Sequence, residues 1–529
     1  MTLAILYSRA SEGIYAPQVT VETHLSNGLP GFSIVGLPET AVKESRDRVR
    51  SALINSHFEF PVQRITVNLA PADLPKDGGR FDLPIALGIL AASGQLPQTA
   101  LQQFEFSGEL ALSGELRPIQ GALPLALAVR DSGRHLILPT DNAAEAGLAS
   151  GLNLLPAKHL LEVCAHLKGR QALPVYQAST PLTLSESLLD LSDVYGQEQA
   201  KRALEIAAAG QHSLLLIGSP GAGKTMLANR LTSILPPMTE QEALETAAVG
   251  SIRGKTFEPS RWQTRPFRAP HHTASSVALV GGGSPPKPGE ISLAHNGVLF
   301  LDELPEYHRA VLEALREPLE SGHITVSRAS YQAQFPAQFQ LITAMNPCPC
   351  GFLLDNKEGR CRCTSQQIER YQSRLSGPLL DRIDLQVLVP ALSPASLLTQ
   401  TSCAQPETSA NVRARVIQAR DIQLARSGLL NARLTTKMLE QFCSLKKTEQ
   451  DFLMQALEQL GLSTRAYHRV LKVARTIADL ADSAQIEADH LSEALSLRYF
   501  DKLYRNSFNP PHPPIGTFSH EGRRHHIKI

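Results

Sequence analysis

Apolar and polar positions alternate with two different periods along the first part of the chain. Over residues 1–168, short apolar runs such as 65–69 alternate with runs of helical period such as 84–90. This pattern is typical of an α+β domain. The next stretch, residues 169–190, is rich in Pro, Ser, Thr and Gln, so we predict a linker there.

The middle of the chain, residues 191–392, is predicted to form an α/β core with a parallel sheet. Apolar runs suited to buried strands alternate with helical segments, and they lie at 213–217, 297–301, 341–345 and 384–389. Residues 393–505 follow a helical period almost throughout, which indicates a helical lid domain. Residues 506–529 hold four prolines and a cluster of His and Arg, and they are predicted to be a disordered tail.

Composition narrows the class of protein. The 51 Lys and Arg residues nearly balance the 50 Asp and Glu residues, so any surface for nucleic acid must be local. Seven cysteines without a secretory leader favour a reducing compartment, with thiols or a metal site rather than disulfides. Because no apolar stretch reaches the ~18 residues of a membrane span, we expect a cytoplasmic protein without a membrane partner.

One segment of the middle region has the composition of a phosphate-binding loop. The sequence GSPGAGKT at 218–225 stands between an apolar strand and a run of helical period. Glycines let backbone N–H groups converge on phosphate oxygens, while the lysine reaches the outer phosphates and the threonine hydroxyl ligates Mg²⁺. The alternative is a glycine-rich turn that binds nothing. The predicted nucleotide site comprises Gly218, Pro220, Gly221, Gly223, Lys224, Thr225 and Met226.

Two carboxylates follow the apolar strand at 297–301. Asp302 is predicted to hold Mg²⁺ through its water shell, and Glu303 to orient or deprotonate the water that attacks the γ-phosphorus. A polar loop start without catalytic function is the alternative interpretation.

Three further residues are candidates for sensing or completing a nucleotide site. Asn346 ends the apolar strand at 341–345 and is predicted to sense the γ-phosphate. Arg382 precedes the strand at 384–389 and is predicted to be an arginine finger for a neighbouring subunit. A surface salt bridge between Arg382 and Asp384 is the alternative. Arg465 opens a lid helix, where it either reaches the nucleotide or is simply solvated.

Together these segments resemble AAA+ ATPases of the group that contains magnesium-chelatase motor subunits and MCM helicases. The whole chain to about residue 505 resembles the ComM/YifB family, most specifically at 268–275 and 288–295. The resemblance implies ATP with Mg²⁺, a ring that is usually hexameric, and assembly that depends on nucleotide or DNA. It further implies a helicase that drives branch migration of DNA during natural transformation, with branched or single-stranded DNA as its partner. The rival hypothesis is a chelatase-like or protein-remodelling ATPase that does not act on DNA.

The first domain resembles the proteolytic domain of Lon. The resemblance is carried by residues 68–79, 107–110 and 114–119. A Lon-type peptidase needs a serine just after the Lys-Asp-Gly turn and a lysine to take its proton. Arg80 and Leu125 stand at those positions. We therefore predict a Lon-protease-like domain that lacks the Ser-Lys dyad and is not a protease.

Four clustered cysteines offer a metal site. Four thiolates can close a tetrahedral zinc site. The C-x-C spacing is tighter than the usual C-x₂-C, so reduced thiols in a loop remain the alternative. The candidate zinc ligands are Cys348, Cys350, Cys361 and Cys363.

Candidate DNA contacts lie on two loops that, by analogy with MCM, face a pore. Lys287 belongs to the Gly- and Pro-rich loop at 281–289, and Arg328 to a predicted hairpin at 323–331. Plain surface hairpins are the alternative. Further candidate phosphate contacts, or else ordinary solvated cations, are Lys76, Arg80 and Arg117.

Overall fold

The chain divides into two compact units. The first joins residues 1–189 to 236–342, and the second joins 190–235 to 343–529. The predicted tail at 506–529 and part of the predicted linker lie outside the described residues. The computed structural model describes residues 3–36, 40–177, 189–254, 258–283, 285–328, 331–354, 360–391, 407–460 and 463–498.

A seven-stranded mixed sheet forms the N-terminal part of the first unit. Strands β1, β2 and β4 pair antiparallel, and the other neighbours pair parallel. Along β2, buried residues alternate with more exposed ones, as expected for a sheet with one covered face. The strand order is β3 (Gly31–Val35), β4 (Arg64–Ala70), β2 (Gln18–Ser26), β1 (Leu3–Arg9), β5 (Phe104–Phe106), β8 (His135–Pro139) and β9 (Leu154–Ala157).

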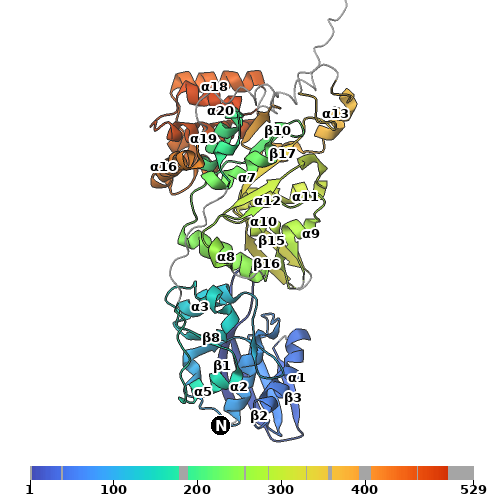
Figure 1. Cartoon of the computed structure of the whole chain (residues 1–529), viewed down its shortest axis with the longest axis vertical. Coiled ribbons are helices and arrows are strands. Elements are labelled where there is room, and N and C mark those ends of the chain that lie inside the picture. The colour runs from blue at the N-terminus through green and yellow to red at the C-terminus, as the bar shows by residue number, and fades with distance from the viewer. Residues whose placement is uncertain are drawn as a thin grey trace, which may run out of the picture. The chain divides into compact units, whose positions relative to one another are not determined.

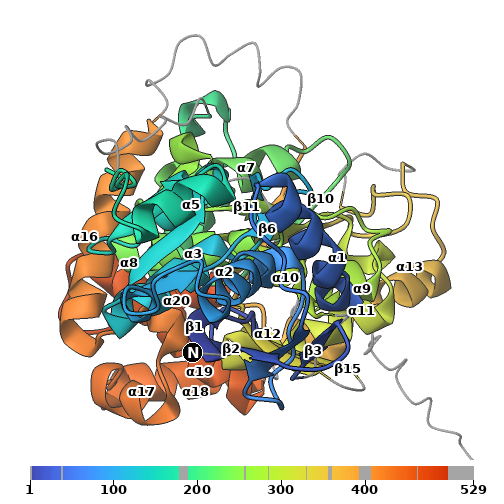
Figure 2. The ribbon, with the colours of Figure 1, turned by 90° about the horizontal axis from the view of Figure 1, so that it is seen from below.

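Helices pack on this sheet and complete two apolar cores. Helix α2 (Asp82–Ala92) is buried along its whole length and contacts β1, β2 and α1 (Thr40–Asn55), drawn in blue in Figures 1 and 2. Helices α3 (Ala122–Ser132) and α4 (Ala143–Ala146) share a second core with β8 and β9. The α+β prediction for this region is thus confirmed.

The segment predicted as a linker is partly packed against the first domain. It follows α5 (Leu160–Leu167), the last helix of that domain. Leu173 is buried in the larger core, and the backbone N–H of Tyr176 donates to the Leu154 carbonyl over 2.9 Å. The polar composition of the segment did not indicate this apolar contact and this hydrogen bond, because both depend on the tertiary fold.

The rest of the first unit carries a buried strand, β14 (Val298–Leu301), and two hairpins. Strand β14 pairs in parallel with β11 (Phe267–Arg268). The predicted hairpin is confirmed as β15 (His323–Arg328) and β16 (Tyr331–Pro336). The Gly- and Pro-rich loop forms a second, shorter hairpin. Remaining elements are α8 (Glu240–Ile252), α9 (Ser276–Val280), β12 (Gly281–Gly282), β13 (Lys287–Pro288), α10 (Glu290–Leu293), α11 (Arg309–Ala314) and α12 (Arg316–Ser321).

The core of the second unit is built on buried parallel strands. All five residues of β10 (Leu214–Gly218) pair with β18 (Leu385–Val389). Residues of β17 (Gln340–Met345) join them, since Thr343 Oγ1 donates to the Leu214 carbonyl over 3.2 Å. Nearby helices are α6 (Glu198–Gly210), α7 (Lys224–Ile234), α13 (Ser365–Gln372) and α14 (Gly377–Leu380).

A group of helices follows, as the helical period predicted. Helix α19 is central to the group, because it contacts α16, α17, α20 and also α6 of the core. The α/β core with an α-helical lid is therefore confirmed within the described residues. Among these, no helix combines the length and apolar character that crossing a bilayer requires. The lid helices are α16 (Ser409–Ser427), α17 (Thr436–Phe442), α18 (Lys447–Leu460), α19 (Thr464–Leu480) and α20 (Ala488–Ser496).

Candidate nucleotide-binding site

Glycines shape the loop between β10 and α7. Gly221 and Gly223 have φ values of 77° and 92°, in the left-handed region that favours glycine. A Cβ on Gly218 would lie 2.3 Å from the carbonyl oxygen of Val389 on β18, so a side chain there would push the two strands apart. The backbone geometry therefore requires the glycines that the sequence pattern singled out.

Lys224 connects this loop to the end of β17. Its ammonium donates to the Gly218 and Ser219 carbonyls over 2.8 and 3.0 Å, and to Asn346 Oδ1 over 3.1 Å. The side chain is buried at the start of α7. Two of the predicted site residues, Lys224 and Asn346, are thus brought together from positions 122 residues apart.

The start of α7 is suited to an anion. Because Gly223 is the N-cap, no N-cap side chain covers the first amides of the helix, which carry partial positive charge. Thr225 and Met226 are exposed in this first turn. The arrangement allows phosphate oxygens to accept from backbone N–H groups beside the Lys224 ammonium.

The two predicted carboxylates belong to the first unit. Asp302 follows the buried strand β14, and its Oδ1 accepts from the Glu303 backbone N–H over 2.9 Å. Glu303 has a φ of 52°, an uncommon value for a residue other than glycine. Its side chain is about half exposed and its Oε2 lies 3.0 Å from His272 Nδ1.

His272 is a partner of Glu303 that the sequence interpretation did not identify. Its ring lies edge-on to Tyr307, whose hydroxyl donates to the Pro270 carbonyl over 2.6 Å. Burial, followed by the negative charges of Asp302 and Glu303, raises the pKa of Tyr307, which keeps it a neutral donor. The signal was present in the sequence, because His272 lies in the stretch 268–275, but that stretch had no assigned role.

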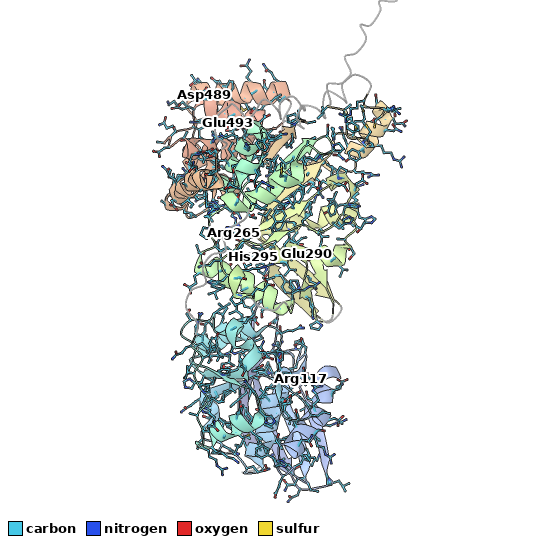
Figure 3. All side chains as sticks on the ribbon, viewed as in Figure 1. Arg117, Arg265, Glu290, His295, Asp489 and Glu493 are labelled. Atoms are coloured by element: carbon cyan, nitrogen blue, oxygen red, sulfur yellow. The ribbon has the colours of Figure 1, made fainter. Side chains whose placement is uncertain are left out.

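The two stretches that carry the closest family resemblance contact each other. The Arg268 guanidinium forms an ion pair with Glu290 over 2.5 Å. His295, in the same stretch as Glu290, lies 3.2 Å from Glu245 on α8. Figure 3 labels Glu290 and His295 near Arg265, which itself pairs with Glu242 over 3.0 Å. The Arg268–Glu290 ion pair links the stretch that carries His272 to α10, while Arg265 and His295 contact α8.

The predicted arginine finger, Arg382, lies three residues before β18 in the second unit. Arg382 Nη1 donates to the Pro378 carbonyl over 2.7 Å. Asp384 is buried and its carboxylate is bound by His212, Ser213 and Arg469. The alternative of a surface salt bridge is therefore wrong for Asp384.

The environment of Asp384 favours its charged form. Burial alone raises the pKa, but the charges of Arg469 and His212 hold the pKa of this carboxyl well below its usual range. Arg469 lies one helical turn beyond Arg465, which is exposed at the start of α19. Arg469 is a second residue that the sequence interpretation missed, since its acceptors lie 85 and 87 residues away.

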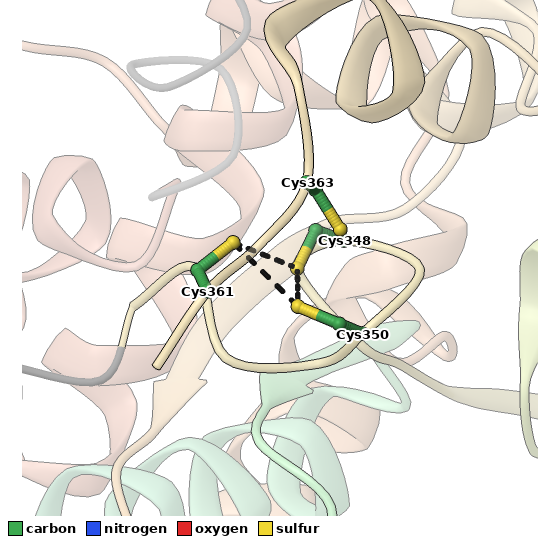
Figure 4. A group of neighbouring side chains, drawn as sticks. All are labelled: Cys348, Cys350, Cys361 and Cys363. Carbon is green, nitrogen blue, oxygen red and sulfur yellow. Dashed lines mark hydrogen bonds between the residues drawn. The ribbon is translucent and has the colours of Figure 1, made fainter. Parts of the chain in front are cut away.

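The four clustered cysteines converge, as Figure 4 shows. All four sulfur atoms lie within 4.8 Å of one another. Three Sγ distances are 3.4, 3.8 and 3.6 Å, for the pairs Cys348–Cys350, Cys348–Cys361 and Cys350–Cys361. A tetrahedral zinc with Zn–S bonds of about 2.3 Å places its sulfurs roughly 3.8 Å apart. The sulfur positions therefore fit a four-thiolate zinc site.

The turn that holds the first two cysteines packs on the phosphate-binding loop. Gly351, just after Cys350, has a φ of 84°. A Cβ built on Gly351 would lie 2.4 Å from Cδ of Pro220. The cysteine turn and the nucleotide loop thus contact each other with no room for a methyl group.

Three of the cations proposed for DNA have partners within the chain. Lys76 is fully buried and donates to the Pro71 carbonyl, while Arg80 is 6% exposed and donates to the Gln120 carbonyl over 3.1 Å. As buried groups they are not phosphate contacts on a free surface, which corrects that prediction. Lys287 donates to Gln120 Oε1 over 3.2 Å.

The other two candidate cations lie at exposed or terminal positions. Arg117 projects from the N-terminal domain, is about two-thirds exposed and lies 3.9 Å from Glu109 (Figure 3). Arg328 ends β15, opposite Tyr331 in the hairpin register, and its side chain lies outside the described residues.

A cavity of about 200 Å³ lies where a Lon-type peptidase would have its nucleophile. Arg80 stands in it together with Asp77 from the N-terminal domain, and both hairpins reach it through Lys287 and Ala333. The lysine position is taken by Leu125, buried on α3. The arrangement offers neither a serine nor a lysine for peptide hydrolysis at the positions where the resemblance requires them.

Family comparisons agree with this architecture. Residues 190–397 match the family model described as magnesium chelatase, subunit ChlI. Models for subunit ChlI of Mg-chelatase and for its C-terminal part match 21–142 and 406–498. The fold and the phosphate loop thus define a magnesium-chelatase-like AAA+ ATPase.

Whole-chain similarity is more specific. The chain is 56% identical to competence protein ComM of Haemophilus influenzae, over 96% of this chain and all of that protein. It is 54% identical to YifB of Salmonella typhimurium, over 95% of this chain and 98% of that protein. The chain belongs to the ComM/YifB family.

A more distant relative supports the Lon-like fold of the N-terminal part. Lon protease 2 of Bacillus subtilis is 26% identical over 235 residues, which cover 38% of this chain and 42% of that protein. The predicted fold class is confirmed, with an AAA+ core and lid preceded by a Lon-like domain.

Proposed function

We propose that this protein is a ring-forming ATPase motor that moves DNA, and that it drives branch migration of recombination intermediates during natural transformation. The proposal rests mainly on the position of Lys224, which links the phosphate-binding loop to Asn346. It is supported by the similarity of the chain to a competence protein over the full length of that protein. We further propose a cytoplasmic location. The proposed organisation is a Lon-like domain (1–168), a linker (169–190), an AAA+ core (191–392), a lid (393–505) and a tail (506–529).

Within one subunit, the proposed roles follow from charge and position. Lys224 and the α7 amides would hold the β- and γ-phosphates of ATP, and Thr225 and Asp302 are each proposed as Mg²⁺ ligands. Glu303 orients the attacking water, and its half-exposed carboxylate beside His272 supports that role. Asn346, which accepts from Lys224, senses whether the γ-phosphate is present.

Two arginines are proposed to complete the site. Arg382 reaches the ATP of a neighbouring subunit, where it stabilises negative charge that develops during phosphoryl transfer. Arg465, exposed at the N-terminus of α19, contacts the nucleotide of its own subunit. These assignments make hydrolysis dependent on a homohexameric ring.

DNA contact is proposed at the two hairpins. A nearly neutral chain can bind a polyanion only where its positive charge is concentrated, and Arg328 at the end of β15 is the main candidate. Lys287 contributes only if it exchanges its present acceptor, Gln120, for a phosphate. Contacts of the Lon-like domain with both hairpins at the cavity near Arg80 support a role for that domain as a collar.

The proposed function is tested by hydrolysis and strand exchange on defined DNA. ATPase rates are measured with four-way junctions, with single strands and without DNA, alongside strand exchange on synthetic forks. The expected result is stimulation by branched DNA, with exchange that is lost in Glu303→Gln although this variant still binds ATP. Absence of stimulation, exchange and DNA retention at low salt would instead favour a chelatase-like or protein-remodelling ATPase.

We also propose that the four-cysteine cluster binds zinc. Cys348, Cys350, Cys361 and Cys363 would supply four thiolates, and the metal would stiffen the turn that packs on Pro220. Metal analysis after purification under reducing conditions is expected to find about one zinc per chain. Cys361→Ser should lose it, while Cys164→Ser, a buried cysteine on α5, should retain it. Metal-free protein with intact ATPase activity would contradict the assignment.

A further inference from the structure

We infer that Arg469 is a positioning residue that ties the nucleotide-facing end of the lid to the arginine finger. The inference rests on the proposed function, in which Arg382 acts on a neighbour and Arg465 on its own nucleotide. Arg465 and Arg469 are four residues apart on α19, so their side chains share one face of the helix. If that face of α19 is displaced, both side chains move with it.

Arg469 holds the backbone from which the finger projects. Its Nη1 donates to the carbonyl of Arg382 over 3.0 Å and also binds the carboxylate of Asp384. The same Arg382 carbonyl accepts from Ser213 Oγ over 2.9 Å. The backbone of residue 382 is therefore bonded to the lid by one donor and to the start of β10 by another.

A buried polar network adds a second connection to α19. His212 is fully buried, with Nδ1 3.3 Å from Asp384 Oδ2 and Nε2 2.8 Å from Thr476 Oγ1. Thr476 lies seven residues beyond Arg469, again on the same helix face. Hydrogen bonds to charged groups are stronger than neutral ones, and a buried charge without its partner is costly. These bonds therefore couple residues 382–384 to α19.

This connection gives Arg469 a specific role in the ring. When a nucleotide changes the position of Arg465, the shift of α19 reaches the Arg382 backbone through Arg469. The position of the Arg382 side chain that one subunit presents to its neighbour then depends on the nucleotide bound to that first subunit. Hydrolysis in one subunit is coupled to occupancy of the next.

The chain offers a matched control for loss of a contact between core and lid. Arg202 on α6 pairs with Glu493 on α20 over 2.8 Å, and with Glu205 over 2.9 Å. Figure 3 labels Glu493 on α20. Arg202 is of comparable exposure, 37% against 25% for Arg469, and its acceptors lie outside residues 382–384. Arg202→Gln removes a lid ion pair without releasing the finger.

Mixed rings of full-length protein distinguish an effect on the neighbour from an effect within the subunit. Glu303→Gln subunits do not hydrolyse ATP but present an intact finger. Alone, Arg469→Gln is expected to lose about tenfold in kcat, with KM for ATP changed less than about twofold. In excess Glu303→Gln subunits its rate per site should recover, as it should for Arg382→Ala. Arg469→Lys should retain intermediate activity, and Arg202→Gln the parental rate.

The assignments of Arg382 and Arg469 would be contradicted by different results. If Arg382→Ala is not rescued in mixed rings, the finger assignment in the proposed function fails. If Arg382→Ala is rescued and Arg469→Gln is not, Arg469 acts within its own subunit and the inference is overturned. Parental kcat in Arg469→Gln also overturns it. If Arg469→Gln does not fold, the same mixing test with Arg469→Lys decides.

Discussion

At the scale of single residues, the informative feature is how Glu303 is held. Its backbone is in the left-handed region, which costs energy in a residue with a side chain, and its carboxylate meets His272. A side chain that must orient a water needs a fixed position. We expect the contact with His272 to supply it.

Substitution of His272 tests this interpretation. His272→Ala removes the group 3.0 Å from Glu303 Oε2 and should lower kcat by about tenfold, or about 1.4 kcal/mol in barrier, with little change in KM for ATP. His272→Asn should retain part of the rate, because its amide can still donate. His271→Ala is the control, since that ring lies against His272 and its Nδ1 is 2.9 Å from Thr273. A parental rate in His272→Ala would show that the contact does not position Glu303.

At the scale of elements, the cysteine turn supports the phosphate-binding loop. Gly351→Ala places a methyl group against Pro220 and should shift the loop, which raises KM for ATP about tenfold. Gly428→Ala is the matched control, because Gly428 has a similar φ of 70° and open space around its Cβ position. Both variants should lose about 1–2 kcal/mol of stability from the left-handed backbone. Equal KM values in the two variants would show that the turn does not support the loop.

Periodicity in the sequence predicted most elements because their burial pattern is local. The apolar run at 65–69 formed β4, and the four apolar residues before Gly218 marked β10. The order of segments singled out Asn346 at the end of the strand after the acidic one, and in the structure its Oδ1 accepts from Lys224. The periodicity of the sequence does not predict contacts between residues that are distant in the chain. The hydrogen bond from the Tyr176 N–H to the Leu154 carbonyl is an example.

The site residues that the sequence did not reveal share one physical property. His272 contacts Glu303, 31 residues away, and Arg469 contacts Asp384, 85 residues away. Neither residue belongs to a sequence motif with the spacing of a known catalytic site. The prediction of phosphate contacts at cations that proved to be buried was wrong for a related reason. The sequence alone does not show whether an arginine such as Arg80 faces solvent or donates to a carbonyl. Only tertiary placement separates these cases.

At the scale of the whole molecule, charge balance limits how the proposed DNA partner can be bound. With 51 basic against 50 acidic residues, affinity must come from a few local contacts, and each phosphate contact contributes a slope of about −0.9 to the dependence of log K on log salt. Arg328→Ala should therefore reduce the slope by about 1 for each subunit that contacts DNA, and weaken binding similarly across sequences.

Arg117→Ala provides the comparison, because Arg117 is about two-thirds exposed on the N-terminal domain and belongs to neither of the two hairpins proposed to contact DNA. DNA affinity of both variants and the parental ring is measured by fluorescence anisotropy at several salt concentrations. Arg117→Ala should keep the parental slope. If it reduces the slope and Arg328→Ala does not, the DNA runs over the Lon-like domain, since only a residue that neutralises a phosphate changes the number of released counterions.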